Sequence, residues 1–247
     1  MARTSRLPPR QAAEGMIAQM QRRADPAKAA SYQRYFKEPV ELYGLDTPTS
    51  RRMLKDLLAR VKGSWTLRDA VSFCKAMVRD PHLEPRGIGF QAVAAFVDEA
   101  GPGLLKDVRR WLERSCGNLA LVDNLAPSVL APLAEKHPEI VPEIVAWTGS
   151  RSLWVRRGAA VTFVPLARHG KCLDTAYEVA SRLFDDREDL IHKAVGWMLR
   201  DAGTTDMPRL ERFLRAEGSK IPRTTVRYAI ERFPKDQRRR LLEATRP

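Results

Sequence analysis

Apolar residues recur three and four positions apart along almost the whole chain, and alternating β-branched runs are rare. This spacing places the apolar side chains on one face of a helix. Turn signals interrupt the pattern at short intervals: Thr47-Pro48 places a capping hydroxyl before a proline at the first helical position, and Gly101-Pro102-Gly103 ends a segment. The pattern predicts an all-α protein, with helices over 48–61, 67–79, 85–100, 104–115, 118–136, 139–148, 152–169, 173–185, 187–202, 206–217, 222–233 and 235–245.

The expected helices come in pairs with a steady period. First helices start near Leu67, Leu104, Glu139, Leu173 and Asp206, at steps of 37, 35, 34 and 33 residues. Helix pairs at this interval are typical of an α-solenoid of the HEAT or TPR kind, in which neighbouring pairs stack into one curved superhelix. A four-helix bundle with appendages fits the number of helices but not the period. We therefore expect one domain of HEAT-like repeats over residues 1–247, with residues 1–10 flexible.

The period extends to single polar residues in the second helix of each pair. Gln91, Asp123, Arg157, Lys193 and Arg227 follow one another at steps of 32, 34, 36 and 34 residues. Because second helices line the inner surface of a solenoid, these residues are expected to form a row along a basic concave face. Asp123 is the only anion of the row. The alternative is that polar positions recur at this interval by chance.

Composition and charge narrow the function. The chain has 247 residues, of which 44% are hydrophobic, and a formal net charge of +13. The apolar content is too high for a disordered chain, and the longest apolar run, 92–97, is too short to span a membrane. The N-terminus has charge but no apolar stretch, which excludes a secretory signal. We expect a soluble cytoplasmic protein whose excess positive charge favours a polyanionic partner.

Nothing in the chain has the spacing of a metal or cofactor site. Three cysteines lie far apart, and the four histidines show no metal-ligand spacing. No glycine-rich phosphate loop and no nucleophilic Ser or Cys arrangement is present. We expect no cofactor and no metal.

Three stretches resemble a known family. The first is Tyr35-Phe36-Lys37, followed by Leu42-Tyr43-Gly44-Leu45-Asp46-Thr47-Pro48 and Arg51-Arg52. The second is Leu121-Val122-Asp123-Asn124 with Pro127, and the third is Trp154-Val155-Arg156-Arg157-Gly158 followed by His192-Lys193-Ala194-Val195-Gly196-Trp197-Met198-Leu199-Arg200. In this order and at these separations they resemble the DNA alkylation repair glycosylases of the AlkD type, which are built from HEAT-like repeats.

The resemblance implies a monofunctional glycosylase without metal or redox cofactor, acting in base excision repair near the bacterial nucleoid. We expect a monomer, because a trough that wraps a duplex works as a single copy. Such enzymes hydrolyse the N-glycosidic bond of cationic alkylated purines, such as 7-methylguanine and 3-methyladenine, in duplex DNA. The duplex lies against the concave face, and the damaged nucleotide is not drawn into a pocket.

The resemblance also assigns site residues. Asp123 matches the catalytic aspartate, and a fixed carboxylate is suited to stabilise the positive charge that develops on the sugar. Trp197 matches a cleft aromatic, which attracts a cation through its ring face. Alternatively, Asp123 is a helix-interior aspartate satisfied by an arginine, and Trp197 fills the core. Expected DNA contacts are Arg157, Arg200, Lys193, Arg156, Arg51, Arg52, Tyr35, Thr47 and Arg227, and Leu119 and Trp154 are expected to form the cleft wall.

One position departs from the family pattern. Active members carry a second tryptophan four residues before the aspartate, where this chain has Leu119. Leucine offers no ring face to a cationic lesion. Three hypotheses therefore stay open: an alkylpurine DNA glycosylase, a non-catalytic HEAT-like binder of damaged or branched DNA, and a protein–protein scaffold.

Overall fold

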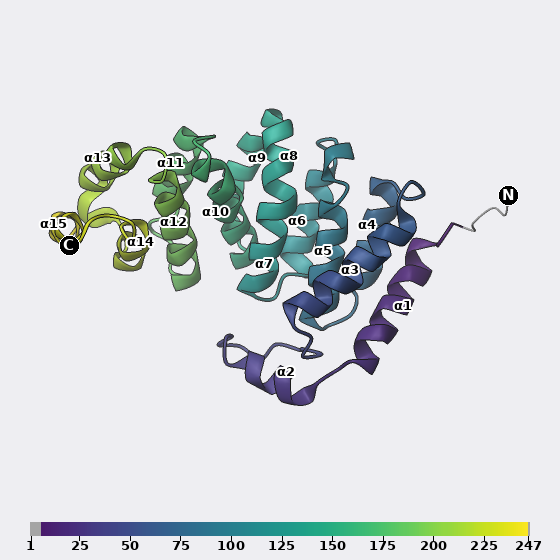
Figure 1. Ribbon diagram of the computed structural model, residues 1–247. Coiled ribbons are helices and arrows are strands. Elements are labelled where there is room, and N and C mark those ends of the chain that lie inside the picture. Colours follow the sequence, from purple (N-terminus) through teal and green to yellow (C-terminus); the bar gives the residue numbers. More distant parts are fainter. Residues whose placement is uncertain (1–5, 247) are drawn as a thin grey trace. The chain divides into compact units, whose positions relative to one another are not determined.

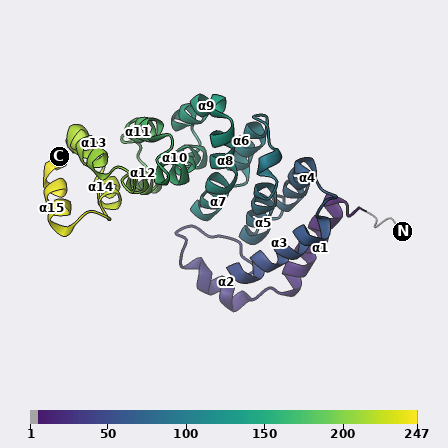
Figure 2. The same ribbon diagram turned by 45° about the horizontal axis from the view of Figure 1, so that its top comes forward.

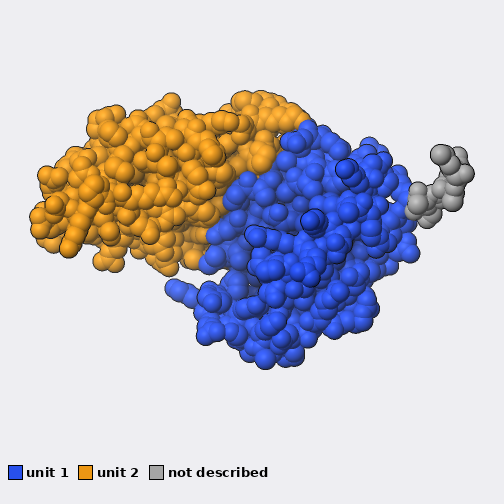
Figure 3. Space-filling view, in the orientation of Figure 1, with its two compact units in different colours: residues 1–129 blue, residues 130–247 orange. Residues whose placement is uncertain are grey.

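A computed structural model of the chain describes residues 6–246. Within this range the chain is helical and contains no strand (Figure 1). It divides into two compact units, residues 1–129 and residues 130–247 (Figure 3).

Unit 1 is built from two sets of helices (Figures 1 and 2). One set holds α1 (Pro9–Arg22), α4 (Leu67–Met77) and α6 (Leu104–Arg114), and the other holds α3 (Thr47–Val61), α5 (Leu83–Ala94) and α7 (Leu119–Leu125). Helix α1 packs on α4 and α4 on α5, while α3 and α7 pack on α5. The short helix α2 (Pro26–Gln33) has no buried residue.

Unit 2 continues the pairing. Helices α10 (Leu153–Arg168), α12 (Asp189–Ala202) and α14 (Arg223–Ala229) pack one on the next, while α11 (Leu173–Arg182) packs on α10 and α12. Helix α13 (Met207–Glu217) packs on α12 and on the last helix, α15 (Lys235–Ala244). Two short helices, α8 (Ala131–Lys136) and α9 (Val141–Ala146), come first.

The predicted fold class, an all-α solenoid of helix pairs, is confirmed. Helices α4, α6 and α11 begin at Leu67, Leu104 and Leu173, as the period predicts. Helix α13 begins one residue after Asp206, because the Asp206 carboxylate caps it by accepting a 2.8 Å hydrogen bond from the Arg209 N–H. Glu139 lies in a 3₁₀ turn before α9 rather than at a helix start.

Several predicted helix boundaries are wrong, and prolines explain the largest difference. The range 118–136 consists of α7, a π-helical turn over Ala126–Leu130 and α8. Pro127 has no N–H to donate to the Asp123 carbonyl four residues earlier, and its ring would clash with that carbonyl in a regular helix. The helix predicted over 85–100 begins earlier, at Leu83, and ends at Ala94 before a 3₁₀ turn. The helix predicted over 139–148 is shorter, because only α9 is α-helical and a 3₁₀ turn lies on each side of it.

The N-terminal region is more structured than predicted. Helix α1 includes Pro9 and Arg10, and the Leu7 carbonyl accepts a 2.9 Å hydrogen bond from the Trp65 indole. Arg6 forms an ion pair with Asp69. Within the range 1–10 that the sequence predicts to be flexible, residues 6–10 thus include a helix start and contacts with Trp65 and Asp69, and residues 1–5 lie outside the described range.

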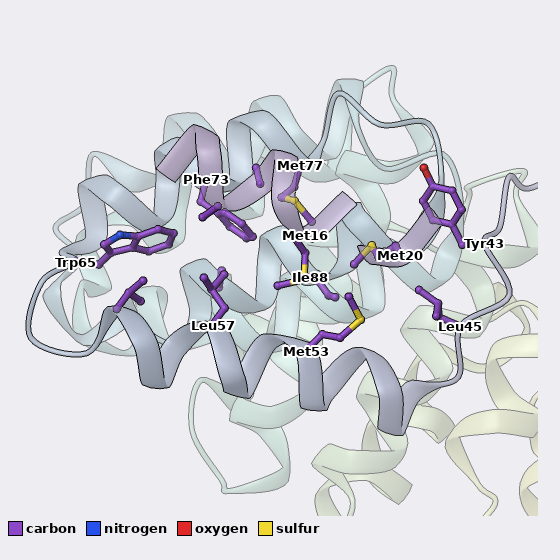
Figure 4. Packing of buried hydrophobic residues seen from close by; sticks show 14 residues of the cluster. Met16, Met20, Tyr43, Leu45, Met53, Leu57, Trp65, Phe73, Met77 and Ile88 are labelled. Carbon is purple, nitrogen blue, oxygen red and sulfur yellow. The ribbon is translucent and has the colours of Figure 1, made fainter. Parts of the chain in front are cut away.

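A methionine-rich core holds α3 against its neighbours in unit 1 (Figure 4). Met16 and Met20 of α1, Met53 of α3 and Met77 of α4 are all buried at its centre. Trp65, Phe73, Leu57 and Ile88 also belong to this cluster. Unbranched thioether side chains fill the irregular space between helices of different direction. The core fixes one face of α3 and leaves its polar face outside.

A buried carboxylate ties the helices of unit 2 together. Asp201 of α12 is fully buried and lies 2.9 Å from the guanidinium groups of both Arg168 of α10 and Arg232, which follows α14. Two cations compensate the desolvation of one anion. The pairing fixes the C-terminal halves of α10, α12 and α14 relative to one another.

Candidate functional site

A buried glutamate sets the start of α3 in unit 1. Glu84 of α5 is only 6% exposed and accepts hydrogen bonds from three consecutive backbone N–H groups, those of Tyr43, Gly44 and Leu45, at 3.1, 2.8 and 3.1 Å. Gly44 has a φ of +81°, and a Cβ there would lie 2.2 Å from the Asp25 carbonyl oxygen. This anchored loop leads directly into α3.

Two further contacts complete the entry to α3. The Asp46 carboxylate caps the helix by accepting a 2.8 Å hydrogen bond from the Thr49 N–H. Hydrogen bonding with the Thr49 side chain, and then with its backbone, lowers the pKa of Asp46. The Tyr43 ring stacks on His82 at 3.7 Å, and the Tyr43 hydroxyl donates to Asp80 at 2.9 Å. The sequence Asp46-Thr47-Pro48 therefore begins α3 from a rigid loop.

An open groove of about 800 Å³ lies between α3 and α5. Leu54, Leu58, Ile88 and Phe96 supply apolar walls. Polar and cationic residues also line it, namely Thr47, Arg51, Lys55 and Lys62 of α3 and its end, Gln91 of α5 and Asn124 of α7. Of the DNA contacts predicted from the sequence, this groove brings Thr47 and Arg51 together.

The other predicted contacts of unit 1 lie elsewhere. Arg52 lines a separate polar pocket with Asp25, Asp46 and Asp56, outside the groove. Tyr35, in the segment after α2, is 73% exposed, and the Arg34 guanidinium lies 6.0 Å from the centre of its ring. Arg51 and Arg52 thus serve different surfaces although they are neighbours in sequence.

Helix α7 presents Asp123 on a half-exposed face. The Asn118 side chain caps the helix by accepting a 3.1 Å hydrogen bond from the Leu121 N–H. Leu119 and Asp123, four residues apart and therefore on one face, are both half-buried, whereas Leu121 and Val122 are buried. The π-helical turn that begins at Ala126 follows directly. Such turns are frequent at functional sites.

Gln91 connects α5 to the end of α7. Its amide nitrogen donates to the Asn124 side-chain oxygen at 2.8 Å and lies 3.2 Å from the Ser128 hydroxyl oxygen. The Ser128 hydroxyl donates in turn to the Asn124 carbonyl at 2.5 Å. The sequence period placed Gln91 one repeat before Asp123. In the structure this amide positions the neighbour of Asp123.

In unit 2, one face of α12 carries a tryptophan between two cations. Lys193, Trp197 and Arg200 are all half-buried. The Lys193 ammonium pairs with Asp189 at 2.8 Å, and this hydrogen bond raises the pKa of Lys193. Arg200 pairs with Glu231, while its Nε atom is buried without a hydrogen-bond partner among the described residues. Neighbouring α14 contributes the exposed Arg227.

The two adjacent arginines of α10 are used within the fold. Arg156 pairs with Asp186 at 2.6 Å and donates to the Ser150 and Arg151 carbonyls at 2.9 and 3.1 Å. Arg157 is 4% exposed and donates to the Leu190 carbonyl near the start of α12 at 2.5 Å. Trp154, one turn earlier than Arg157, is half-buried. Arg156 therefore has a structural role that the sequence did not reveal.

Comparison with known proteins identifies the family of the chain. The family model described as DNA alkylation repair enzyme matches residues 16–233. The chain belongs to this family. Among solved structures, it is similar to a predicted DNA alkylation repair enzyme from Enterococcus faecalis, with a TM-score of 0.76 and 18% sequence identity over 85% of this chain and 97% of that one. No curated protein matches the sequence.

Membership of the DNA alkylation repair enzyme family supports a role in the repair of alkylated DNA, with DNA as the partner. The structural likeness, at its low identity, supports the fold alone. No helix within residues 6–246 has the length and apolar character to cross a membrane.

Four residues that line or support the groove of unit 1 were not predicted from the sequence as site residues. Lys55 and Lys62 line the groove with Arg51, and their spacing of four and eleven residues from Arg51 is the signal that places all three on one helical face. Asn124 appeared only as the neighbour of Asp123. Glu84 had no signal, because the loop that it binds is 40 residues away in sequence.

A glycine behind Trp197 allows α14 to approach α12. A Cβ at Gly196 would lie 2.5 Å from the Tyr228 Cβ and 2.8 Å from the Thr225 carbonyl oxygen. Gly196→Ala is therefore expected to lower the free energy of unfolding by about 1–3 kcal/mol, because one neighbour is backbone and the helices must separate. Thermal denaturation measures this change in stability. Gly15→Ala, with open space around the added methyl group, is the control, and an equal effect of both variants would contradict the prediction.

Proposed function

We propose that the protein is a DNA glycosylase that hydrolyses the N-glycosidic bond of cationic alkylated purines, such as 7-methylguanine and 3-methyladenine, in duplex DNA. The observation that carries this proposal is the position of Asp123. It stands on the half-exposed face of a capped helix, held through Asn124 and Gln91, in a chain of the DNA alkylation repair enzyme family.

The chemistry needs a carboxylate and water. Alkylation of a ring nitrogen makes the purine a cation, so the base leaves with the bonding electron pair as a neutral molecule. Positive charge grows on the sugar as the bond breaks, and the Asp123 carboxylate stabilises it. A water oxygen then bonds to the anomeric carbon, and its proton passes to Asp123 or to solvent. Because the leaving group is already activated, the step requires no metal or redox cofactor.

The cations of unit 1 contribute affinity. Arg51, Lys55 and Lys62 follow one face of α3 along the groove, and the Thr47 hydroxyl lies at its start. We assign these side chains to phosphates of the DNA backbone, where they fix position without reading sequence. Tyr35, with its exposed ring, is a further contact. We leave Arg52 and Arg156 out of the central contacts, because Arg52 lies outside the groove and Arg156 is held by Asp186.

Unit 2 contributes the aromatic surface. Trp197 lies between Lys193 and Arg200 on α12. Its indole attracts a cationic purine or sugar through the ring face, which is worth about 0.5–2 kcal/mol. Lys193, Arg200 and Arg227 bind phosphates, and Arg157 supports the start of α12 through the Leu190 carbonyl. Trp154 adds apolar surface in unit 2, and Leu119 adds an apolar side chain beside Asp123 in unit 1. A single copy of the chain, acting at the nucleoid, supplies every residue of this proposal.

One observation favours a second candidate, a non-catalytic binder of damaged or branched DNA. Leu119 occupies the face of α7 that it shares with Asp123, so no aromatic ring stands beside the carboxylate on that helix. DNA binding by the cations does not depend on this position. The two candidates therefore differ in base release and agree in duplex binding.

The test is release of base from methylated DNA. Duplex treated with a methylating agent is incubated with the protein, and free 7-methylguanine and 3-methyladenine are measured by chromatography. The proposal expects release well above the spontaneous rate. Binding without release supports the second candidate, and absence of binding to duplex at low salt leaves a protein scaffold.

A further inference from the structure

A second cationic cluster lies on the other helix set of unit 1. Lys75 and Arg79 come from α4 and the turn after it, and Arg110 and Arg114 come from α6. Together with Val78, Trp111 and Ser115 they line a pocket of about 310 Å³ between these two helices. We call the four cations the α4–α6 quartet. None of them lines the groove between α3 and α5.

The quartet is built from the repeat. Arg110 and Arg114 are four residues apart within α6 and therefore share one helical face, and Lys75 near the end of α4 comes four residues before Arg79 in the turn that follows. Each residue of the first pair is followed by a residue of the second pair after 35 residues, one repeat later. Arg110 and Arg114 are therefore about 6 Å apart along the axis of α6. Two pairs of positive charges thus border one pocket.

The charge of the quartet is largely uncompensated. All four side chains are exposed, and within residues 6–246 only Lys75 pairs with a carboxylate, that of Asp107 at 2.8 Å. Among the described residues, no acidic side chain lies within ion-pair distance of Arg79, Arg110 or Arg114, since the nearby Glu113 pairs with Arg109. Clustered like charges repel one another in the folded state. An arrangement with this cost is suited to an anionic partner.

We propose that the α4–α6 quartet binds the phosphate backbone of a second DNA duplex. Planar guanidinium groups match the geometry of phosphate oxygens, and three of the four cations are arginines. A protein partner is less well matched, because Trp111 is only 3% exposed and offers no aromatic anchor. The inference rests on the proposed function for the first duplex, and it makes the protein able to bridge two duplexes.

The test compares two triple variants of the full chain. Arg79→Gln/Arg110→Gln/Arg114→Gln removes three charges of the quartet but keeps side-chain packing. Arg22→Gln/Arg60→Gln/Arg68→Gln removes three charges from exposed positions of the same unit that line neither the groove nor the quartet pocket. Thermal denaturation verifies that both variants fold.

Two short duplexes, one with a donor and one with an acceptor fluorophore, report bridging, and sedimentation reports stoichiometry. We expect wild type and the control to bind two duplexes and to give energy transfer, and the quartet variant to bind one. The dependence of the second binding step on salt should be steep, with a contribution to the log–log slope of about 0.9 for each of the three removed arginines.

The outcomes separate this inference from the proposed function. If both variants bridge duplexes equally well, or if the wild-type protein never binds more than one duplex, the quartet is not a DNA site. The proposed function is unaffected in both cases, because the first duplex still binds. Binding of a polyglutamate peptide by wild type in place of the second duplex overturns it in favour of an acidic protein partner. Failure to bind any duplex overturns the proposed function and this inference with it.

Discussion

Asp123→Asn is expected to slow release of 7-methylguanine from methylated duplex by about 100- to 1,000-fold, the usual cost of removing one preorganised electrostatic group. Asparagine preserves the size of the side chain but cannot neutralise the charge that grows on the sugar. It also accepts a proton from the attacking water poorly. Single-turnover assays with excess protein measure the effect, because they separate chemistry from product release.

Duplex affinity is the companion measurement for Asp123→Asn. Removing a negative charge from a protein that binds a polyanion should leave the dissociation constant unchanged or lower it. Asp185→Asn is the matched control, since Asp185 is exposed and its side chain forms no hydrogen bond or ion pair within residues 6–246. Loss of both binding and release would indicate a folding role for Asp123, and unchanged release would remove it from the chemistry.

Glu84→Ala is expected to destabilise the protein by about 3–5 kcal/mol, because three buried N–H donors lose their acceptor. The loop 43–45 would then no longer hold the start of α3, so DNA affinity should fall together with stability. Thermal and denaturant unfolding measure the first effect, and titration with duplex below the unfolding temperature measures the second.

Two further variants test whether the lost hydrogen bonds of Glu84 cause the destabilisation. Glu84→Gln keeps one acceptor oxygen, so it should cost less than alanine. Glu41→Ala removes an exposed glutamate at the end of the same loop and should change stability by less than about 0.5 kcal/mol. A small effect of Glu84→Ala, or equal effects at both positions, would show that the loop is held by its other contacts.

The sequence by itself determined the helical class and the pairing. Apolar spacing and capping residues act over one or two turns, so the starts of α4, α6 and α11 could be predicted from local patterns. The same period placed Asp123, Lys193 and Arg227 on second helices. Pro127 is visible in the sequence, but only the backbone shows that α7 ends in a π-helical turn there.

Tertiary structure decided the use of each polar side chain. Arg51 and Arg52 are adjacent in sequence, yet packing of Met53 into the core sends them to different surfaces. Arg156 forms an ion pair with Asp186, and Glu84 accepts hydrogen bonds from a loop that comes 40 residues earlier. Buried polar groups need partners, and the fold supplies these partners from distant parts of the chain. Such partners are distant in sequence, so no local pattern contains them.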